Sequence, residues 1–307
     1  MQTDSTKVKL SLIILMMIIG LLLINSSILA GDLKLIHDKK FEASNGGILN
    51  LKSAVGDVNI QSWSNSEVSV KVFGNEKAAK ELEFSFSKTG QVIKIKAEKE
   101  SINPFKWLNN VALRYEIKVP KEFQVEIFTA GGDVNIDEIN GKFDVNTSGG
   151  DIKMQNNLGN IFLKTSGGDI EVKNHKGNVN AETSGGDIKM QIVGNVNCST
   201  SGGDIDLITE NGKVIASTSG GDVTLKYWGE NKGIELGTSG GDIKCLIPSS
   251  TKANVELRTF GGEINLDFSN SSTTKIKSSR YEGKFNGGGA ELICKTSGGN
   301  ISVSEVK

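Results

Sequence analysis

Thr165-Ser166-Gly167-Gly168-Asp169-Ile170 is one of nine exact or closely related copies of a six-residue segment, and this repetition decides the fold. Exact copies occupy residues 147–152, 165–170, 183–188, 200–205 and 238–243, and near copies occupy residues 129–134, 218–223, 259–264 and 296–301. The aspartates at 133, 151, 169, 187, 204, 222 and 242 are separated by steps of 18, 18, 18, 17, 18 and 20 residues. A near-constant period of this size is typical of a solenoid that stacks one supersecondary unit.

The unit around this segment, residues 159–172, contains two short strands joined at a glycine turn. Ile161, Leu163 and Thr165 alternate before the turn, and Ile170 and Val172 alternate after it. Residues at every second position of a strand share one face, so one face of each strand is directed inward. The sequence therefore predicts an all-β, right-handed parallel β-solenoid with about 18 residues per coil. A third short sheet formed by the variable connectors is an open alternative.

Charged residues on the outward side support this register. The position between the two inward residues of the second strand is occupied on successive coils by Lys153, Glu171, Lys189 and Asp206. Opposite charges on neighbouring strands stabilise a sheet and like charges destabilise it. The alternation is therefore the one expected if the coils stack directly on each other.

Composition agrees with an all-β chain and excludes one class of partner. Among 307 residues, glycine is abundant at 37 and proline scarce at 3, which fits short strands joined by tight turns. Lys plus Arg total 35 and Asp plus Glu total 36, for a net charge of -1. Such a chain lacks the basic excess that would hold a nucleic acid.

Residues 1–30 are predicted to be a targeting segment. Lys7 and Lys9 precede a mostly apolar run from residue 10 to 24, and Ile28-Leu29-Ala30 offers a small-residue cleavage site. The 21 residues from 10 to 30 are also about long enough to cross a bilayer, so an uncleaved N-terminal membrane anchor is the alternative. Either way we expect an exported protein, which is periplasmic, outer-surface or secreted, or else anchored to the inner membrane.

Residues 31–120 are expected to form an entry region with a capping segment, and residues 121–307 the solenoid repeats. In the entry region, Asn75 can cap a short helix over residues 76–82 that covers the open end. Pro104, Phe105 and Trp107 are interpreted as covering an end or flank of the solenoid, with a binding platform as the alternative. Residues 268–285 break the period and are expected to loop out or form an extra arm, after which a last turn runs from residue 292 to 303.

The cysteines and histidines offer little chemistry. Cys198, Cys245 and Cys294 occupy strand positions that are apolar in other repeats, so we interpret them as buried thiols and predict no disulfide. His37 lies in the entry segment and His175 in a connector expected to be exposed. Neither lies beside a candidate nucleophile, and no zinc-ligand spacing occurs, so we expect no catalytic residues and no enzyme activity.

Four sets of residues taken together resemble a known family. They are the Thr-Ser-Gly-Gly-Asp-Ile repeats, the entry pattern from Gly46-Gly47 through Gly56-Asp57-Val58-Asn59-Ile60 to Trp63, the strand end Ile117-Lys118-Val119-Pro120, and Gly287-Gly288-Gly289 before the last coil. They are similar to the bacterial putative-adhesin family of β-strand-repeat proteins of unknown function, over about residues 42–304. The resemblance implies an extracytoplasmic solenoid, with adhesion as the label that the family carries, and it supplies no catalytic residues.

The aspartate column is the single candidate site that the repeat suggests. Its members are Asp133, Asp151, Asp169, Asp187, Asp204, Asp222 and Asp242. Stacked at a strand spacing of about 4.8 Å, these carboxylates repel each other unless something offsets their charge. Ca²⁺ is one candidate. The interpretation that we favour has each Asp accept hydrogen bonds from amides of its own turn, with glycine at positive φ permitting the turn. On that interpretation no cofactor or metal is needed.

Two functions remain open from the sequence. The first is a non-enzymatic envelope or cell-surface scaffold that binds a surface glycan or protein through its flanks. The second is a Ca²⁺-stabilised carbohydrate-binding or polysaccharide-acting protein. In both, a membrane is contacted only through the N-terminal segment, if that segment is not cleaved.

Overall fold

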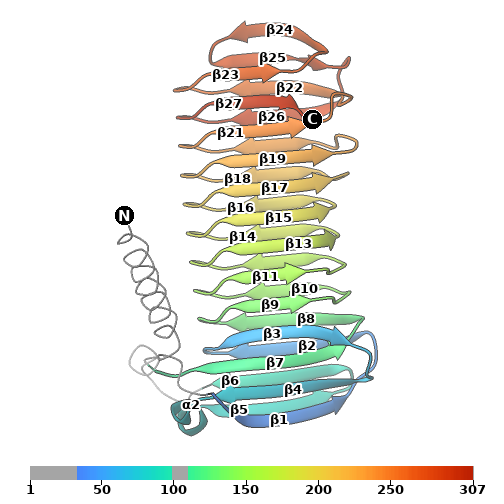
Figure 1. The fold of residues 1–307 in the computed structure, drawn as a ribbon, viewed down its shortest axis with the longest axis vertical. Helices are drawn as coiled ribbons and strands as arrows, with labels where there is room; N and C mark the ends of the chain where they lie inside the picture. The colour runs from blue at the N-terminus through green and yellow to red at the C-terminus, as the bar shows by residue number, and fades with distance from the viewer. Residues whose placement is uncertain (1–32, 99–109, 307) are drawn as a thin grey trace, which may run out of the picture.

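The computed structural model describes residues 33–98 and 110–306. These residues form a long stack of strands that face each other in two sheets, with antiparallel strands at both ends of the stack (Figure 1). Within the described ranges one sheet has 13 strands and the other 14. The signal or anchor segment expected in residues 1–30, and the aromatic group Pro104, Phe105 and Trp107, lie outside the described residues.

The 13-stranded sheet contains, in spatial order, β1 (Lys34–Glu42), β4 (Glu67–Gly74), β7 (Leu113–Pro120), β3 (Asp57–Trp63), β9 (Val134–Asp137), β11 (Ile152–Gln155), β13 (Ile170–Lys176), β15 (Ile188–Val193), β17 (Ile205–Glu210), β19 (Val223–Trp228), β21 (Ile243–Ile247), β27 (Ile301–Glu305) and β23 (Ile264–Asp267). The 14-stranded sheet contains, in spatial order, β24 (Ser271–Lys277), β25 (Arg280–Phe285), β22 (Ala253–Arg258), β26 (Ala290–Lys295), β20 (Ile234–Gly237), β18 (Val214–Ser217), β16 (Val196–Ser199), β14 (Val179–Glu182), β12 (Ile161–Lys164), β10 (Phe143–Asn146), β8 (Phe123–Thr129), β2 (Gly47–Ser53), β6 (Val92–Glu98) and β5 (Glu83–Thr89).

The repeat places one strand in each sheet per coil. β12 belongs to the 14-stranded sheet, the Thr165–Ile170 corner follows, and β13 belongs to the 13-stranded sheet. Ile170 pairs in parallel with Ile152 on one side and with Ile188 on the other. The sequence prediction of an all-β stack of parallel strands is confirmed. The connectors contribute only isolated bridges in the described part, through Asn140 and Leu158, rather than a third sheet.

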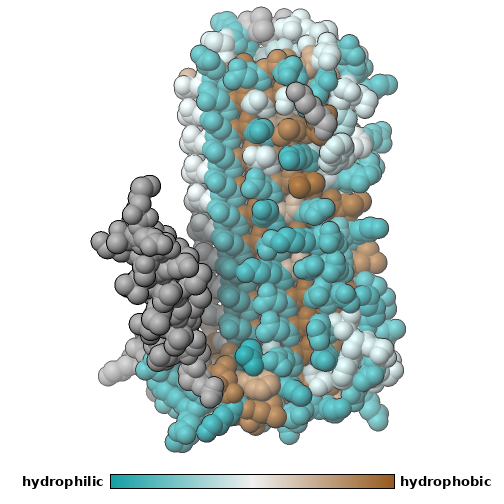
Figure 2. All heavy atoms as spheres, viewed as in Figure 1, coloured by the Kyte–Doolittle hydropathy of each residue, from teal (hydrophilic) through white to brown (hydrophobic). Residues whose placement is uncertain are grey.

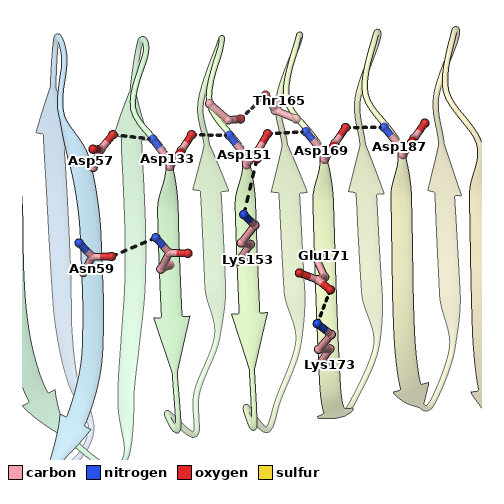
Figure 3. A network of polar contacts seen from close by, with 12 residues as sticks. Asp57, Asn59, Asp133, Asp151, Lys153, Thr165, Asp169, Glu171, Lys173 and Asp187 are labelled. Carbon is pink, nitrogen blue, oxygen red and sulfur yellow. Dashed lines mark hydrogen bonds and ion pairs between the residues drawn. The ribbon is translucent and has the colours of Figure 1, made fainter. Parts of the chain in front are cut away.

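The outward charged residues Lys153, Glu171, Lys189 and Asp206, here called the charge column, confirm the predicted register. Their ion pairs, however, form along the chain and not between neighbouring strands. Lys153 lies opposite Glu171, and Glu171 lies opposite Lys189. The ion pairs instead join residues two positions apart along the chain, since Glu171 pairs with Lys173 and the Lys153 Nζ lies 3.7 Å from Asp151 Oδ2 (Figure 3). Such exposed pairs contribute little to stability, so the register depends on the core.

Alternating burial builds one continuous core between the two sheets. Leu163 and Ile170 are fully buried, and Thr165 is 2% exposed. The intervening residues of the same strands are exposed or half-buried, as period-two patterning requires. In the space-filling view, hydrophilic side chains cover most of the visible face of the stack, with apolar residues visible between them (Figure 2).

The second corner glycine is required by contact with the preceding coil. A Cβ added at Gly168 would lie 2.0 Å from the Gly150 carbonyl oxygen, whereas a Cβ at Gly167 would lie 3.8 Å from Gly149 O. Neither Gly167 nor Gly168 adopts a positive φ. The expectation that these glycines supply a left-handed turn is therefore wrong, because the close stacking of backbones is what excludes a side chain at the second position.

The N-terminal end is closed by antiparallel strands. β4 pairs with both β1 and β7, and β5 pairs with β6. The predicted helix is confirmed as α2 (Glu76–Glu81), and the Asn75 side chain accepts a hydrogen bond from the Ala78 amide at 2.9 Å. β2 and β3 come early in the sequence but lie inside the stack, between strands that follow them in the chain.

The C-terminal end is also out of sequence order. β26 lies between β20 and β22, and β27 lies between β21 and β23. The last turn, which was expected to end the stack, is therefore inserted beneath the coil that precedes it in the chain. The segment expected to loop out or form an extra arm forms the antiparallel strands β24 and β25, which add to β22, and Phe268 stacks on Phe285 at 4.1 Å between ring centroids. No helix in the described residues is long and apolar enough to cross a membrane.

Alanine substitution tests the role of the second corner glycine. Gly168→Ala should lower the free energy of unfolding by about 1–3 kcal/mol or more, because the added methyl overlaps the neighbouring backbone. Gly167→Ala, one residue away in the same corner, should change it by less than about 0.5 kcal/mol. Urea unfolding followed by circular dichroism compares the two variants, and equal losses would contradict this account of the corner.

Candidate functional site

The repeated threonines link neighbouring coils. The Thr165 hydroxyl donates to the Gly150 carbonyl of the preceding coil at 2.9 Å and accepts a hydrogen bond from the Gly168 amide of its own corner at 3.3 Å. The same pair of bonds recurs at Thr147, Thr183, Thr200, Thr218, Thr238, Thr259 and Thr296. All of these threonines are buried. Their hydroxyls are therefore hydrogen-bonded inside the protein and are not available to a ligand.

The aspartates also form bonds between coils, not within their own turns. The Asp169 amide donates to Asp151 Oδ1 at 2.9 Å, and the Asp187 amide donates to Asp169 Oδ1 at 2.8 Å (Figure 3). The same bond links successive members of the series Asp57, Asp133, Asp151, Asp169, Asp187, Asp204, Asp222, Asp242, Asn300 and Glu263. The expectation that each Asp accepts hydrogen bonds from amides of its own turn is wrong. The threonine hydroxyl already bonds to an amide of that turn, and parallel stacking places each carboxylate beside an amide of the next coil.

The aspartate column offers one carboxylate per coil, with one oxygen of each already bonded to an amide. The described residues contain no group of three or more His, Cys, Asp or Glu side chains arranged to hold a metal ion. Ca²⁺ prefers six to eight oxygen ligands, more than such a column supplies at one point. Whether cations associate with the column Asp133, Asp151, Asp169, Asp187, Asp204, Asp222 and Asp242 stays a hypothesis.

His175 is buried, contrary to the expectation of an exposed connector. It is 1% exposed, its Nε2 lies 2.9 Å from the Gly159 carbonyl oxygen, and its Nδ1 has no hydrogen-bond partner. β13 continues as far as Lys176, and a register shift after Val172 turns His175 inward. Burial lowers the pKa of His175 below its ordinary value, so the ring is held neutral.

The three cysteines are buried and free. Burial raises the pKa of Cys198 to about 12. Contact with Cys245, together with burial, raises the pKa of Cys294. The proximity of Cys245 and Cys294 could not be expected from their sequence positions, because it follows from the insertion of β26 beside β20.

A trough crosses the outer face of the 13-stranded sheet near its N-terminal end. It has a volume of about 700 Å³ and is lined by residues from β1, β4, β7, β3, β9, β11 and β13, which are consecutive neighbours in the sheet. Asn59, Gln61, Asn135 and Gln155 contribute side-chain amides to the lining, and Trp63 is its aromatic residue. Sequence reasoning noted Trp63 but missed the trough, since its strands are adjacent only after the non-sequential pairing of the entry region.

Three contacts hold side chains of the trough in place. The Trp63 indole donates to the Glu67 carbonyl at 2.8 Å, and the Lys118 ammonium lies 5.6 Å from the centroid of the indole ring. The Asn135 side-chain nitrogen donates to Asn59 Oδ1 at 3.0 Å (Figure 3). An ordered surface of amides beside an anchored indole is suited to binding a polar ligand through hydrogen bonds and ring contact.

Some charged side chains in the trough form ion pairs and others do not. Lys40 pairs with Glu67 at 3.0 Å, and Glu116 pairs with Arg114 at 3.1 Å. In the part of the chain that the structure describes, neither Lys71 nor Lys118 forms an ion pair within 4.0 Å of a carboxylate. They lie on the adjacent strands β4 and β7, one diagonal step apart. Lys71 lies opposite Asp38 of β1 and Glu116 of β7 in the sheet, although no ion pair joins them in the described residues. The lining as a whole holds five lysines, at 40, 71, 118, 153 and 173, against the three acidic residues Glu116, Asp137 and Glu171.

Comparisons with known proteins identify the family of this architecture. The family model described as Toastrack DUF4097 matches residues 48–304. A crystal structure of a putative adhesin from Bacteroides fragilis is 13% identical with a TM-score of 0.44 and covers 88% of this chain and 97% of that chain. A putative cell adhesion protein from Clostridium sporogenes is 15% identical with a TM-score of 0.34, covering 90% and 100%. A putative lipid binding protein from Parabacteroides distasonis is 18% identical with a TM-score of 0.31, covering 88% and 96%. No curated protein matches the chain.

Removing one threonine hydroxyl tests the bonds between coils. Thr165→Val should lower the free energy of unfolding by about 1–3 kcal/mol, because it leaves the Gly150 carbonyl and the Gly168 amide buried without a partner. Thr165→Ser keeps the hydroxyl and should lose clearly less. Denaturant unfolding of both variants measures the difference, and a valine variant as stable as the serine variant would contradict this role of the hydroxyl.

Substitution of one aspartate separates hydrogen bonding from cation binding. Asp169→Asn retains an acceptor oxygen and should melt close to the parent, whereas Asp169→Ala leaves the Asp187 amide without its acceptor and should cost about 0.5–1.5 kcal/mol. Melting of the parent should be the same in EDTA and in millimolar Ca²⁺. An increase of several degrees with Ca²⁺ that disappears in both variants would establish the column as a cation site.

The buried imidazole should make the fold sensitive to acid. The unfolded His175 binds a proton near its ordinary pKa of 6.5, while the folded residue stays neutral to lower pH. The free energy of unfolding should therefore decrease as the pH falls below about 6.5. His175→Gln should reduce this dependence, whereas His37→Gln should retain the part due to His175. The free energy of unfolding should be measured between pH 4 and 8 for the parent and both variants. Identical slopes against pH in all three proteins would refute this role of His175.

Proposed function

Because this chain belongs to the Toastrack DUF4097 family, we propose that it is a non-enzymatic, exported scaffold of the bacterial cell envelope that binds a macromolecular partner through the trough. The scaffold is the two-sheet stack, with right-handed coils of about 18 residues. The observation that carries the proposal is that the polar groups of the repeat are bonded inside the stack, whereas those of the trough are on its surface. The repeated threonines and aspartates bond between coils, while the trough holds amides together with Lys71 and Lys118, which form no ion pair in the described residues.

The placement of the reactive side chains supports a binding role. His175 is buried with its Nε2 against a backbone carbonyl, and His37 lies between Phe84 and Phe86, at 4.6 and 5.1 Å between ring centroids. The free cysteines are buried, and burial raises the pKa of Cys198 well above physiological pH. A nucleophile needs an adjacent base or a lowered pKa, and these groups have neither.

The N-terminal sequence supports export. Lys7 and Lys9, the apolar run that follows and the small-residue site before Gly31 are the features of a secretory signal, or of an anchor if uncleaved. A long, stiff stack attached or released outside the cytoplasm presents the trough to envelope or surface material.

A blocked trough tests the proposal. Labelled protein should sediment with intact cells or envelope fragments of the producing bacterium, and Gln155→Trp, which places an indole in the trough, should reduce the bound fraction at least about tenfold. Gln191→Trp is the matched control, because Gln191 is equally exposed on the same sheet two coils away, outside the trough. Equal binding by the parent and both variants would overturn the assignment of the trough.

A further inference from the structure

We propose that the trough binds a linear anionic polysaccharide laid along the axis of the stack, with acidic groups of the polymer at Lys71 and Lys118. This inference rests on the proposed function and specifies its partner. It follows from the length of the trough, the types of its side chains and the excess of lysines over acidic residues in its lining.

The length of the trough fits an extended polymer. Its lining comes from seven neighbouring strands, from β1 to β13. At the spacing of strands in a sheet, about 4.8 Å, seven strands extend over about 29 Å. A small molecule would leave most of this length empty. An extended chain of sugar rings can contact every strand, because each ring advances along the polymer by close to one strand spacing.

The middle of the trough carries side chains that match sugar hydroxyls. The bond between Asn135 and Asn59 uses one donor and one acceptor, which leaves the Asn59 amide nitrogen and the Asn135 amide oxygen for a ligand. Gln61 and Gln155 are exposed beside them. Amide side chains both donate and accept hydrogen bonds, as hydroxyl groups do, so a row of them can bind successive sugars of either orientation.

The aromatic side chain in the lining adds a rigid apolar surface. Trp63 is half-buried, and its indole nitrogen is already bonded to the Glu67 carbonyl. The remaining ring surface can contact the C–H groups of a sugar without leaving a polar atom unpaired. A protein partner of comparable affinity would ordinarily require a cluster of apolar anchors at the centre of its interface. A single indole among amides and charges therefore favours a glycan.

The unpaired lysines select the charge of the polymer. Lys40, Lys153 and Lys173 each lie near a carboxylate of this chain. Lys71 and Lys118 have no such partner in the described part of the molecule, and they lie on neighbouring strands beside Gln61 and Ser69. Diagonal neighbours in a sheet are about 7–8 Å apart, which is close enough for both ammonium groups to act on one polymer segment. Carboxylate groups of the polymer would balance the excess of lysines in the lining, where five lysines face three acidic residues, Glu116, Asp137 and Glu171.

Calorimetric titration with defined oligosaccharides tests the inference on the full chain. Oligomers of galacturonic acid should bind, and neutral oligomers of glucose of the same length should bind at least about tenfold more weakly. Lys71→Gln combined with Lys118→Gln should weaken galacturonate binding about tenfold and leave glucan binding unchanged. Added salt should weaken binding of the acidic oligomer to the parent, because exposed charges are screened.

The matched control is Lys226→Gln combined with Lys244→Gln. Both lysines are exposed on strands of the same sheet, outside the trough, and should leave binding unchanged. Equal affinity for acidic and neutral oligomers, or an equal loss in both double variants, would overturn the inference. If intact envelopes bind through the trough while no acidic oligosaccharide does, the inference fails and the proposed function stands. If envelopes also fail to bind, both fail.

Discussion

The close approach of neighbouring backbones at each corner is the constraint on which the rest of the stack depends. The space above the second corner glycine is occupied by a carbonyl of the preceding coil, so a residue with a Cβ cannot be accommodated there without displacing a coil. Once two coils are in contact at this point, the threonine hydroxyl reaches the glycine carbonyl of one coil, and the aspartate carboxylate reaches the amide of the next. The six repeated residues are therefore a joint between coils.

The bonds between coils leave little of the repeated segment free to bind a ligand. A periodic motif rich in Gly and Asp suggests a metal or phosphate site, but its threonine hydroxyls and one oxygen of each aspartate are already bonded within the protein. The positions that differ from coil to coil are the outward residues of the strands and the connectors, and these carry the amides, lysines and indole of the trough. In a solenoid the repeat supplies a regular frame, and binding specificity comes from its non-repeating surface positions.

Much of the architecture could be predicted from the sequence. The period and the alternation of apolar residues predicted parallel stacking, the charge column predicted its register, and Asn75 predicted the helix cap. These features are local or strictly periodic. The partner of each aspartate could not be predicted, because it depends on which atoms the neighbouring coil presents.

Non-sequential strand order accounts for the remaining differences. The insertion of β26 and β27 brings Cys294 beside Cys245, and the return of β7 beside β3 assembles the trough from residues more than a hundred positions apart. His175 was misplaced for a different reason, a strand longer than expected with a register shift in it. Neither effect leaves a periodic signal in the sequence.

Amide hydrogen exchange at the corners tests the joint between coils most directly. The account predicts that the amides of Asp169 and Asp187 are protected in EDTA, although their side chains are exposed, because each donates to the carboxylate of the preceding coil. The buried Gly168 amide, bonded to Thr165, should be protected at least as strongly. Aspartate amides that exchange at the rate of an unfolded chain in EDTA, and become protected only when Ca²⁺ is added, would contradict it.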